Sequence, residues 1–371
     1  GVTWTYYPIY EKSTCVITSV DISRDGEVVV PSCLGGRPVE QIGTILEGCT
    51  NRISVVVPEG VTAIADFAFE KCVGLVSVVL PKSVKRIGCS AFSGCTQLKS
   101  VTIPDGVEII QNATFMGCAS LVSVSIPSSV RHIDSMAFMD CHSLTSITLP
   151  EGIEKIEDYT FCDCSSLRSI DIPSSVTNIG HLAFSSCAFA TIEIPECVVA
   201  MDGDAFTLCE LAKSIRIPAH LTNIYDGDGR IYVGSSVTSI VVDADNECYC
   251  SVDGVLYDRD FKTLLRYPPG KEGAAIIPEG IEQICDYAFS GSLITELVMP
   301  SSLVSIGSGA FQGCSGIRAL TIPNAVTCIA SLLPREYYHV TNVSLCSTFT
   351  NVTDALFSGC LSLQEVTIPP N

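Results

Sequence analysis

Prolines recur at a nearly fixed spacing through most of this chain of 371 residues. They stand at positions 58, 81, 104, 127, 150 and 173, each 23 residues after the one before, and then at 195 and 218. A fixed period of this size is typical of a solenoid, in which one repeat cannot bury its apolar residues alone and its neighbours complete the core. The spacing therefore predicts one continuous stack of coils instead of two or three globular domains.

The same string of residues returns between successive prolines, with the pattern I-P-x-x-V-x-x-I-x-x-x-A-F-x-x-C-x-x-L-x-x-V-x-I-P. The alternation at residues 100–103 predicts a short strand, which Pro104 ends because proline cannot donate to a backbone ladder. Turn residues such as Asp105 and Gly106 follow the proline. The Ala-Phe pair at residues 91–92 predicts one tight helical turn, with the Phe ring in the core. We therefore expect a curved stack of short parallel β-strands with short helical turns.

The 20 cysteines divide into two sets by their place in the repeat. Ten lie three residues after the Phe or its substitute, and these are Cys49, Cys72, Cys95, Cys118, Cys141, Cys164, Cys187, Cys209, Cys314 and Cys360. Free cysteine is among the most buried residue types, so we interpret this set as part of the core. The pairs Cys162/Cys164 and Cys248/Cys250 have one residue between them, which is not zinc-ligand spacing, and we expect no metal. The spacing leaves open whether any out-of-register cysteines form a disulfide between adjacent coils.

The register breaks in several places, and these breaks divide the chain. We expect residues 1–30 to form N-terminal cap strands and residues 31–371 to form the solenoid, with an irregular insert at about 225–275 and an irregular segment at about 324–355. Within the insert, residues 251–258 and 263–270 alternate like the two strands of a small β-hairpin insertion. The last repeat stops in mid-unit at Asn371, so we expect the native chain to continue or to have been cut there.

Composition and charge exclude several classes of function. The chain is 47% hydrophobic and only 16% charged, which requires a large buried interior and excludes disorder. Its formal charge is −19, so its averaged field repels phosphate, and we expect no nucleic-acid partner. No apolar run reaches the length of a membrane-spanning helix, and we expect no membrane insertion by this segment.

These motifs together resemble the BspA-like branch of the leucine-rich repeat proteins. The resemblance covers about residues 20–371. It rests on the string ending in Cys-x-x-Leu-x-x-Val-x-Ile-Pro, on Val30-Pro31-Ser32 with the Gly-Gly-Arg-Pro-Val segment at residues 35–39, and on the insert at residues 251–270. It implies a leucine-rich repeat solenoid. Members of this branch are secreted or displayed on cell surfaces, and several are adhesins, so the resemblance implies an extracellular location and a host matrix or cell-surface protein as partner.

Outward positions of the predicted strands form two columns rich in serine and threonine. One column contains Ser77, Ser100, Ser123, Ser146, Ser169, Thr191 and Ser214, and the other contains Val79, Thr102, Ser125, Thr148, Asp171, Glu193 and Arg216. Such hydroxyls have a structural explanation, because small residues permit curvature and pair across strands. The functional hypothesis is that the charged deviations give a ligand surface its specificity. The candidate ligand-binding residues are Lys99, Arg168, Asp171, Glu193, Lys213, Arg216 and Arg318.

Motifs for catalysis or cofactor binding do not appear in the chain. The five histidines share no column of the repeat, and there is no nucleophile elbow, zinc-protease motif or phosphate-binding glycine loop. The segments Asp226-Gly227-Asp228-Gly229 and Asp202-Gly203-Asp204 hint at calcium, but neither continues into a full binding loop, and we interpret them as turns. We therefore expect no enzyme, no cofactor and a non-catalytic, adhesin-like module for a protein or glycan. The alternatives are a structural spacer or dimerising stalk that presents another domain, and an accessory to an enzyme.

Overall fold

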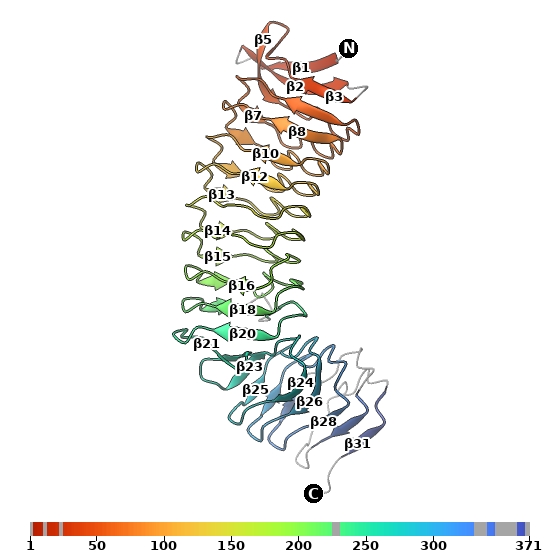
Figure 1. Ribbon diagram of the computed structural model, residues 1–371, viewed down its shortest axis with the longest axis vertical. Coiled ribbons are helices and arrows are strands. Elements are labelled where there is room, and N and C mark those ends of the chain that lie inside the picture. The colour runs from red at the N-terminus through yellow and green to blue at the C-terminus, as the bar shows by residue number, and fades with distance from the viewer. Residues whose placement is uncertain are drawn as a thin grey trace. The chain divides into compact units, whose positions relative to one another are not determined.

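The computed structural model of the chain describes residues 3–9, 13–21, 25–224, 231–329, 340–345 and 362–367 (Figure 1). They form two compact units. Unit 1 comprises Gly1–Phe189 with Ala205–Thr207, and unit 2 comprises Ala190–Asp204 with Leu208–Asn371. Every regular element in the described residues is a strand, so none of them forms a helix that could cross a membrane.

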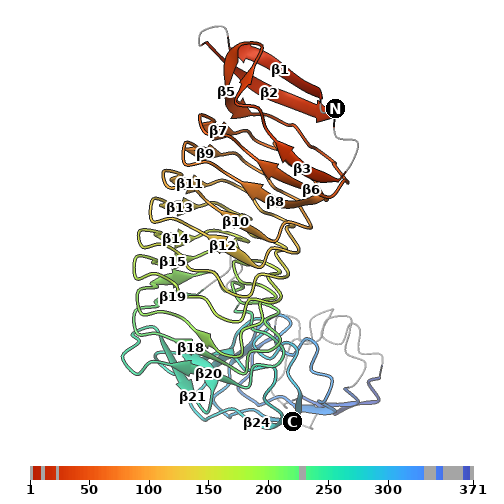
Figure 2. The ribbon, with the colours of Figure 1, turned by 45° about the horizontal axis from the view of Figure 1, so that its top comes forward.

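Unit 1 is a stack of coils that each contribute up to two short strands (Figure 2). The strands that precede the repeat proline form the first column: β3 (Gly26–Val29), β6 (Ile53–Val56), β8 (Leu75–Val79), β10 (Ser100–Thr102) and β12 (Ser123–Ser125). The strands that follow it form the second column: β2 (Thr14–Asp21), β5 (Arg37–Ile42), β7 (Ala63–Ile64), β9 (Arg86–Ile87), β11 (Ile109–Ile110), β13 (His132–Ile133), β14 (Lys155–Ile156) and β15 (Asn178–Ile179). Pairing between coils is parallel in both columns. The antiparallel additions are β1 (Thr3–Ile9) on β2 and β4 (Cys33–Leu34) on β5.

Unit 2 repeats the same arrangement of parallel strands. Its first column contains β16 (Ile192–Glu193), β18 (Ser214–Ile217), β20 (Ser239–Val242), β24 (Gly273–Ile276), β26 (Ile294–Val298), β28 (Ala319–Thr321), β30 (Asn342–Ser344) and β31 (Glu365–Thr367). Its second column contains β17 (Ala200–Met201), β19 (Asn223–Ile224), β23 (Thr263–Arg266), β25 (Gln283–Ile284), β27 (Ser305–Ile306) and β29 (Cys328–Ile329). The predicted solenoid of parallel strands is thus confirmed in each unit.

The predicted β-hairpin insertion is present in unit 2 and has a third strand. Strands β21 (Tyr249–Val252), β22 (Val255–Asp258) and β23 follow one another in antiparallel order. Strand β23 also pairs in parallel with β25, so the insertion is continuous with the second column. Residues 226–229, and residues 330–339 and 346–355 of the predicted irregular segment, lie outside the described residues.

The segment around the repeat phenylalanine is not the short helical turn that we predicted. Its alternate N–H groups donate to the next coil, as Phe69 does to the Ala91 carbonyl at 2.8 Å and Lys71 to the Ser93 carbonyl at 2.7 Å. The N–H groups between them donate three residues back within the coil. Positive φ angles at Phe67 (60°) and Lys71 (55°) interrupt any helical run. The segment is therefore a series of tight turns that forms a third hydrogen-bonded face between coils.

The core of unit 1 is built around a stack of phenylalanine rings, one from each of six successive coils. Phe69, Phe92, Phe115, Phe138, Phe161 and Phe184 are each 0% exposed. Neighbouring rings are nearly parallel, with centroids 5.1 to 5.6 Å apart. Unit 2 continues this theme with Tyr267 stacked on Phe289 at 4.8 Å. The predicted inward placement of the phenylalanines is confirmed.

The in-register cysteines form a second internal column beside the phenylalanines. Five of these thiols donate to the carbonyl of the phenylalanine in the preceding coil, at 3.1 to 3.3 Å, in the pairs Cys95–Phe69, Cys118–Phe92, Cys141–Phe115, Cys164–Phe138 and Cys187–Phe161. Burial raises the pKa of the Cys118 and Cys141 thiols well above 9.0. The column is therefore a set of small apolar groups that also satisfy a backbone acceptor. Among the out-of-register cysteines, free thiols are found at Cys15, Cys33, Cys89, Cys162, Cys248, Cys250 and Cys285.

Serine side chains just after the repeat proline link neighbouring coils, at every second junction between coils. The Ser129 hydroxyl accepts the N–H of Gly106 at 3.1 Å and donates to the Val107 carbonyl at 2.8 Å. Ser83, Ser175 and Ser302 make the same two bonds. Coils with glycine after the repeat proline therefore alternate with coils that have serine there. Gly106 has a φ of 105°, a backbone conformation that favours glycine. The true structural unit in these regions is a pair of coils, which the 23-residue period did not reveal.

Candidate ligand-binding face

The candidate face is the solvent side of the first strand column, which we call the strand face. Its backbone is fixed by pairing between coils, as in the register Ser100↔Ser123 and Thr102↔Ser125 of β10 and β12. Their outward side chains are exposed, whereas Val101 and Val124 between them face the core. Short hydroxyl side chains leave this face open, so any longer side chain on it projects into solvent.

In unit 1 the three predicted site residues are all exposed. Lys99 and Arg168 each lie immediately before the outward serine of their coil, Ser100 and Ser169. Their N–H groups donate to the preceding coil, to the Val76 carbonyl at 3.3 Å and the Thr145 carbonyl at 3.4 Å. Asp171 forms an isolated parallel bridge with Thr148, which carries the strand face past β12. The repeat therefore presents these charged side chains from equivalent backbone positions.

In unit 2 the four predicted site residues are also exposed, and two of them lie side by side. Glu193 on β16 is the register partner of Arg216 on β18, so both side chains leave the same column. The Arg216 Nη2 atom lies 3.2 Å from Asp243 Oδ2 in an ion pair that the repeat pattern did not predict. Lys213 precedes β18 and Arg318 precedes β28. Their surroundings therefore differ, because Arg216 is held by a carboxylate and Lys213 belongs to the wall of a recess.

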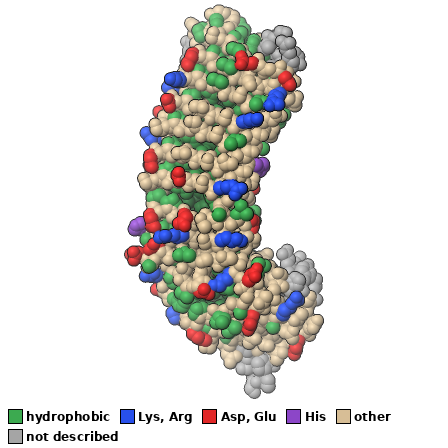
Figure 3. All heavy atoms as spheres, in the orientation of Figure 1, with side chains coloured by type: hydrophobic (Ala, Val, Ile, Leu, Met, Phe, Trp, Pro, Cys, Tyr) green, Lys and Arg blue, Asp and Glu red, His purple; other side chains and the backbone are tan. Residues whose placement is uncertain are grey.

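Two recesses lie near these columns, and the repeat pattern of the sequence predicted neither. The one in unit 1, of about 430 Å³, lies along the second column and is lined by Lys85, Arg86, Gly106, Glu108, Ile109 and Gln111. Within it, Arg86 is already paired with Asp66 at 2.5 Å. The one in unit 2, of about 640 Å³, includes Lys213 and opens where the first-column strands begin. Charged side chains of both signs are scattered over the face seen in Figure 3, without a patch of a single sign.

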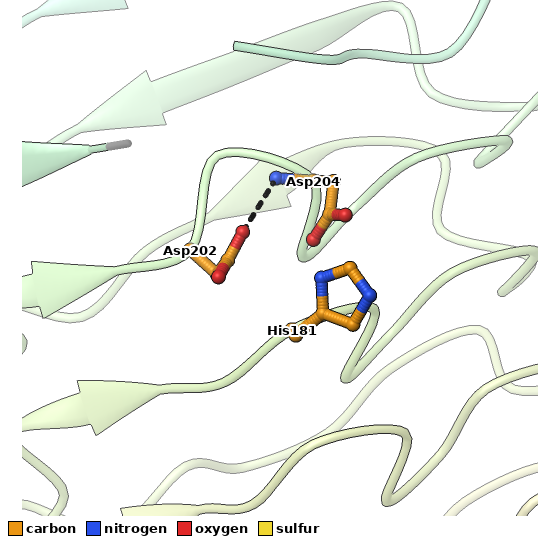
Figure 4. Close-up of side chains that lie close together, drawn as sticks. All are labelled: His181, Asp202 and Asp204. Carbon is orange, nitrogen blue, oxygen red and sulfur yellow. Dashed lines mark hydrogen bonds between the residues drawn. The ribbon is translucent and has the colours of Figure 1, made fainter. Parts of the chain in front are cut away.

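The acidic segment at residues 202–204 forms a local turn. The N–H of Asp204 donates to Asp202 Oδ1 at 3.3 Å, which is the hydrogen bond of an Asx turn (Figure 4). Elsewhere in the described residues, the thiols and phenols with displaced pKa values are shifted first by burial, as for Cys95 and Tyr267. These pKa shifts result from burial in the core, so they do not mark a catalytic site. This agrees with the fold, because a leucine-rich repeat solenoid is typically a non-catalytic scaffold.

Comparison with known proteins supplies a family. The model of the BspA type leucine-rich repeat region matches residues 39–145, 131–247 and 273–371, in six copies. A leucine-rich repeat protein from Bacteroides ovatus is 24% identical with a TM-score of 0.61, over 98% of this chain and 92% of that one. A leucine-rich cell surface protein from Faecalibacterium prausnitzii is 23% identical with a TM-score of 0.57, over 99% and 93% of the two chains. No curated protein matches the chain significantly.

Proposed function

We propose that this chain, which belongs to the BspA-type leucine-rich repeat family, is an adhesin-like module of the cell surface or extracellular space. Repeat solenoids of this kind bind other proteins through extended surfaces. The proposed ligand is a protein or glycan, such as a host matrix or cell-surface protein, and it contacts the strand face. The proposed location takes support from a structural relative that is described as a cell surface protein.

One observation carries this proposal: the strand face is open, rich in serine and threonine, and marked by a few exposed charges. All seven candidate side chains are exposed, and those before the strands project from equivalent positions of different coils. A face made only to close the stack would need no such charges, because the serine and threonine side chains already satisfy it. Charges at fixed spacing on a rigid surface instead give selectivity for a partner of complementary charge.

Binding of the whole chain to immobilised matrix proteins and to a glycan array tests the proposal. Unit 1 is changed by Lys99→Glu with Arg168→Glu, and unit 2 by Lys213→Glu with Arg216→Glu, so that each unit is tested by itself. The matched control reverses exposed cations away from the strand face, through Lys82→Glu with Arg131→Glu. We expect at least one strand-face pair to weaken binding while the control does not.

Two other outcomes would reject the proposal. Equal binding by all variants would show that the strand face is not the contact surface. No binding to any matrix protein or glycan, by a correctly folded chain, would favour the alternative of a structural spacer or dimerising stalk.

A further inference from the structure

The recess of about 640 Å³ in unit 2 spans the starts of four successive first-column strands. Its wall is formed by Lys213 before β18, Ser235, Ser236 and Thr238 before β20, Gly270, Lys271 and Glu272 before β24, and Gly291 and Leu293 before β26. Hydrogen bonds from Gly270 N–H to the Val237 carbonyl (2.8 Å) and from Leu293 N–H to the Pro269 carbonyl (3.0 Å) join these coils. Its volume is within the range of ligand clefts in proteins.

Two short turns create this recess. In a full coil, the buried residue of the first-column strand lies nine positions after the stacked aromatic residue, as Leu320 does after Phe311. Ala275 lies only eight positions after Tyr267, and Leu297 only eight after Phe289. Ala275 and Leu297 are register partners. Two adjacent coils therefore lack one residue each at the same place, and the surface sinks between longer neighbours.

The hairpin insertion fixes one cation of the recess. Asp253 lies in the tight turn between β21 and β22, and its Oδ2 atom is 2.6 Å from Lys271 Nζ. Lys271 Nζ also donates to the Asp253 backbone carbonyl. Its side chain is only 23% exposed, so this ammonium group is held in place with one donor left for a ligand. The insertion thus has a visible effect on the wall of the recess.

Lys213 is the second cation of the recess, and its side chain is exposed. Its backbone is anchored, because its carbonyl accepts from the N–H and the hydroxyl of Thr238 at 2.8 and 3.1 Å. Across the described residues, no carboxylate lies within ion-pairing distance of its ammonium group. Glu272 is exposed on the same wall, and its negative charge disfavours the binding of a ligand with several acidic groups. The recess therefore suits one carboxylate at Lys213, and not a polyanion.

Apolar side chains lie exposed next to these polar groups. Leu293 is 47% exposed in the recess itself. Ile276 is 72% exposed and Val298 is 44% exposed at the ends of β24 and β26, and the two are register partners. We call Ile276 and Val298 the apolar pair. Their place in the outward column is taken by serine, threonine or a charged residue in most other coils. Ile276 lies four positions after Glu272 of the recess wall, which corresponds to roughly 13 Å along an extended strand.

We propose that the recess and the apolar pair together bind a short extended peptide segment of a protein partner, with one acidic side chain followed by apolar ones. The carboxylate binds Lys213 and the remaining donor of Lys271, and the apolar side chains cover Leu293, Ile276 and Val298. About four extended residues reach from the recess to the apolar pair. An acidic saccharide would supply the carboxylate, but it would leave the apolar pair in water. This inference rests on the proposed function and assigns it a partner chemistry and a site in unit 2.

Methyl NMR of the whole chain, labelled at leucine, isoleucine and valine, tests this site with defined probes. The probes are the acetylated, amidated tetrapeptides EGLV and QGLV, and glucuronate. We expect EGLV to shift the methyl signals of Leu293, Ile276 and Val298, and QGLV to bind about threefold more weakly because it lacks the charge. Lys213→Glu should weaken EGLV binding by at least as much. Lys82→Glu, which reverses an exposed lysine of unit 1, should leave binding unchanged.

Three results would overturn the inference. The first is the absence of any methyl shift with EGLV. The second is that EGLV and QGLV bind with the same affinity, both to the wild-type chain and to Lys213→Glu. The third is a shift at the recess with glucuronate as large as that with EGLV, which would make the ligand a saccharide. If the recess fails while the strand-face reversals still weaken partner binding, only this inference falls and the proposed function stands.

Discussion

Replacing Phe115 by alanine probes the feature on which the stack of unit 1 depends. The Phe115 ring is 0% exposed and lies between Phe92 and Phe138, with both centroid distances 5.5 Å and interplanar angles of 3° and 8°. Loss of a buried phenylalanine costs about 3 to 5 kcal/mol, because it removes apolar burial and leaves a cavity. Aromatic pairs add about 0.5 to 1.5 kcal/mol each, and this substitution removes two of them. We therefore expect the upper part of the range, about 4 to 5 kcal/mol.

Urea denaturation followed by circular dichroism measures this loss, with Phe115→Leu and Val122→Ala as companions. Phe115→Leu keeps an apolar side chain and should lose about half as much stability. Val122 is 49% exposed in the same repeat, so Val122→Ala should change stability by less than about 0.5 kcal/mol. The role of the ring stack would be refuted if Phe115→Ala lowered the free energy of unfolding by less than about 1 kcal/mol and by no more than Val122→Ala does.

The remaining predictions concern the links between coils and the buried thiols. Ser129→Ala should lower the free energy of unfolding by about 1 kcal/mol, because it leaves Gly106 N–H without its acceptor, whereas Ser128→Ala at the exposed neighbour should be silent in the same urea titration. Gly74→Ala should destabilise more than either, since its Cβ would collide with the Asn51 carbonyl of the preceding coil, and an unchanged melting temperature would contradict that packing. Burial raises the pKa of Cys95 and Cys314 from 9.0 to about 12 in the folded chain, so the unfolded chain loses these protons first. Stability should therefore be constant below about pH 8 and fall between about pH 9 and 12, by about 1.4 kcal/mol per pH unit for each such thiol, with a shallower fall in Cys95→Ala. In native chain at pH 8, a thiol reagent should label exposed Cys33 at once and reach Cys118 and Cys141 only after unfolding; fast labelling of the buried pair would show that the column opens.

Periodicity predicted the parts of the fold that every coil shares. The inward Phe115, the buried Cys118 and the outward Ser123 follow from their places in the repeat, because one coil stacked on another must treat equivalent residues alike. The segment at residues 67–71 was predicted wrongly as a helical turn. Its residues have no sequence signal for positive φ, since Phe67 and Lys71 are not glycine, and the hydrogen bonds that hold them come from the next coil. Tertiary pairing there outweighs local preference.

The site was harder to predict than the fold because it depends on differences between coils. Averaging the repeat to find its pattern removes the information that Tyr267–Ala275 and Phe289–Leu297 are each one residue short, although both gaps can be counted in the sequence. The cation Lys213 was among the candidates because it is a charged residue one position before the serine column. Lys271 was not, since it lies in the irregular insert and its ammonium group is positioned by Asp253. In a repeat protein the shared positions determine the stack, and a ligand site needs at least one departure from them. Coils that lose or gain a residue are therefore the first places in this chain to test for binding, ahead of charged positions in coils of standard length.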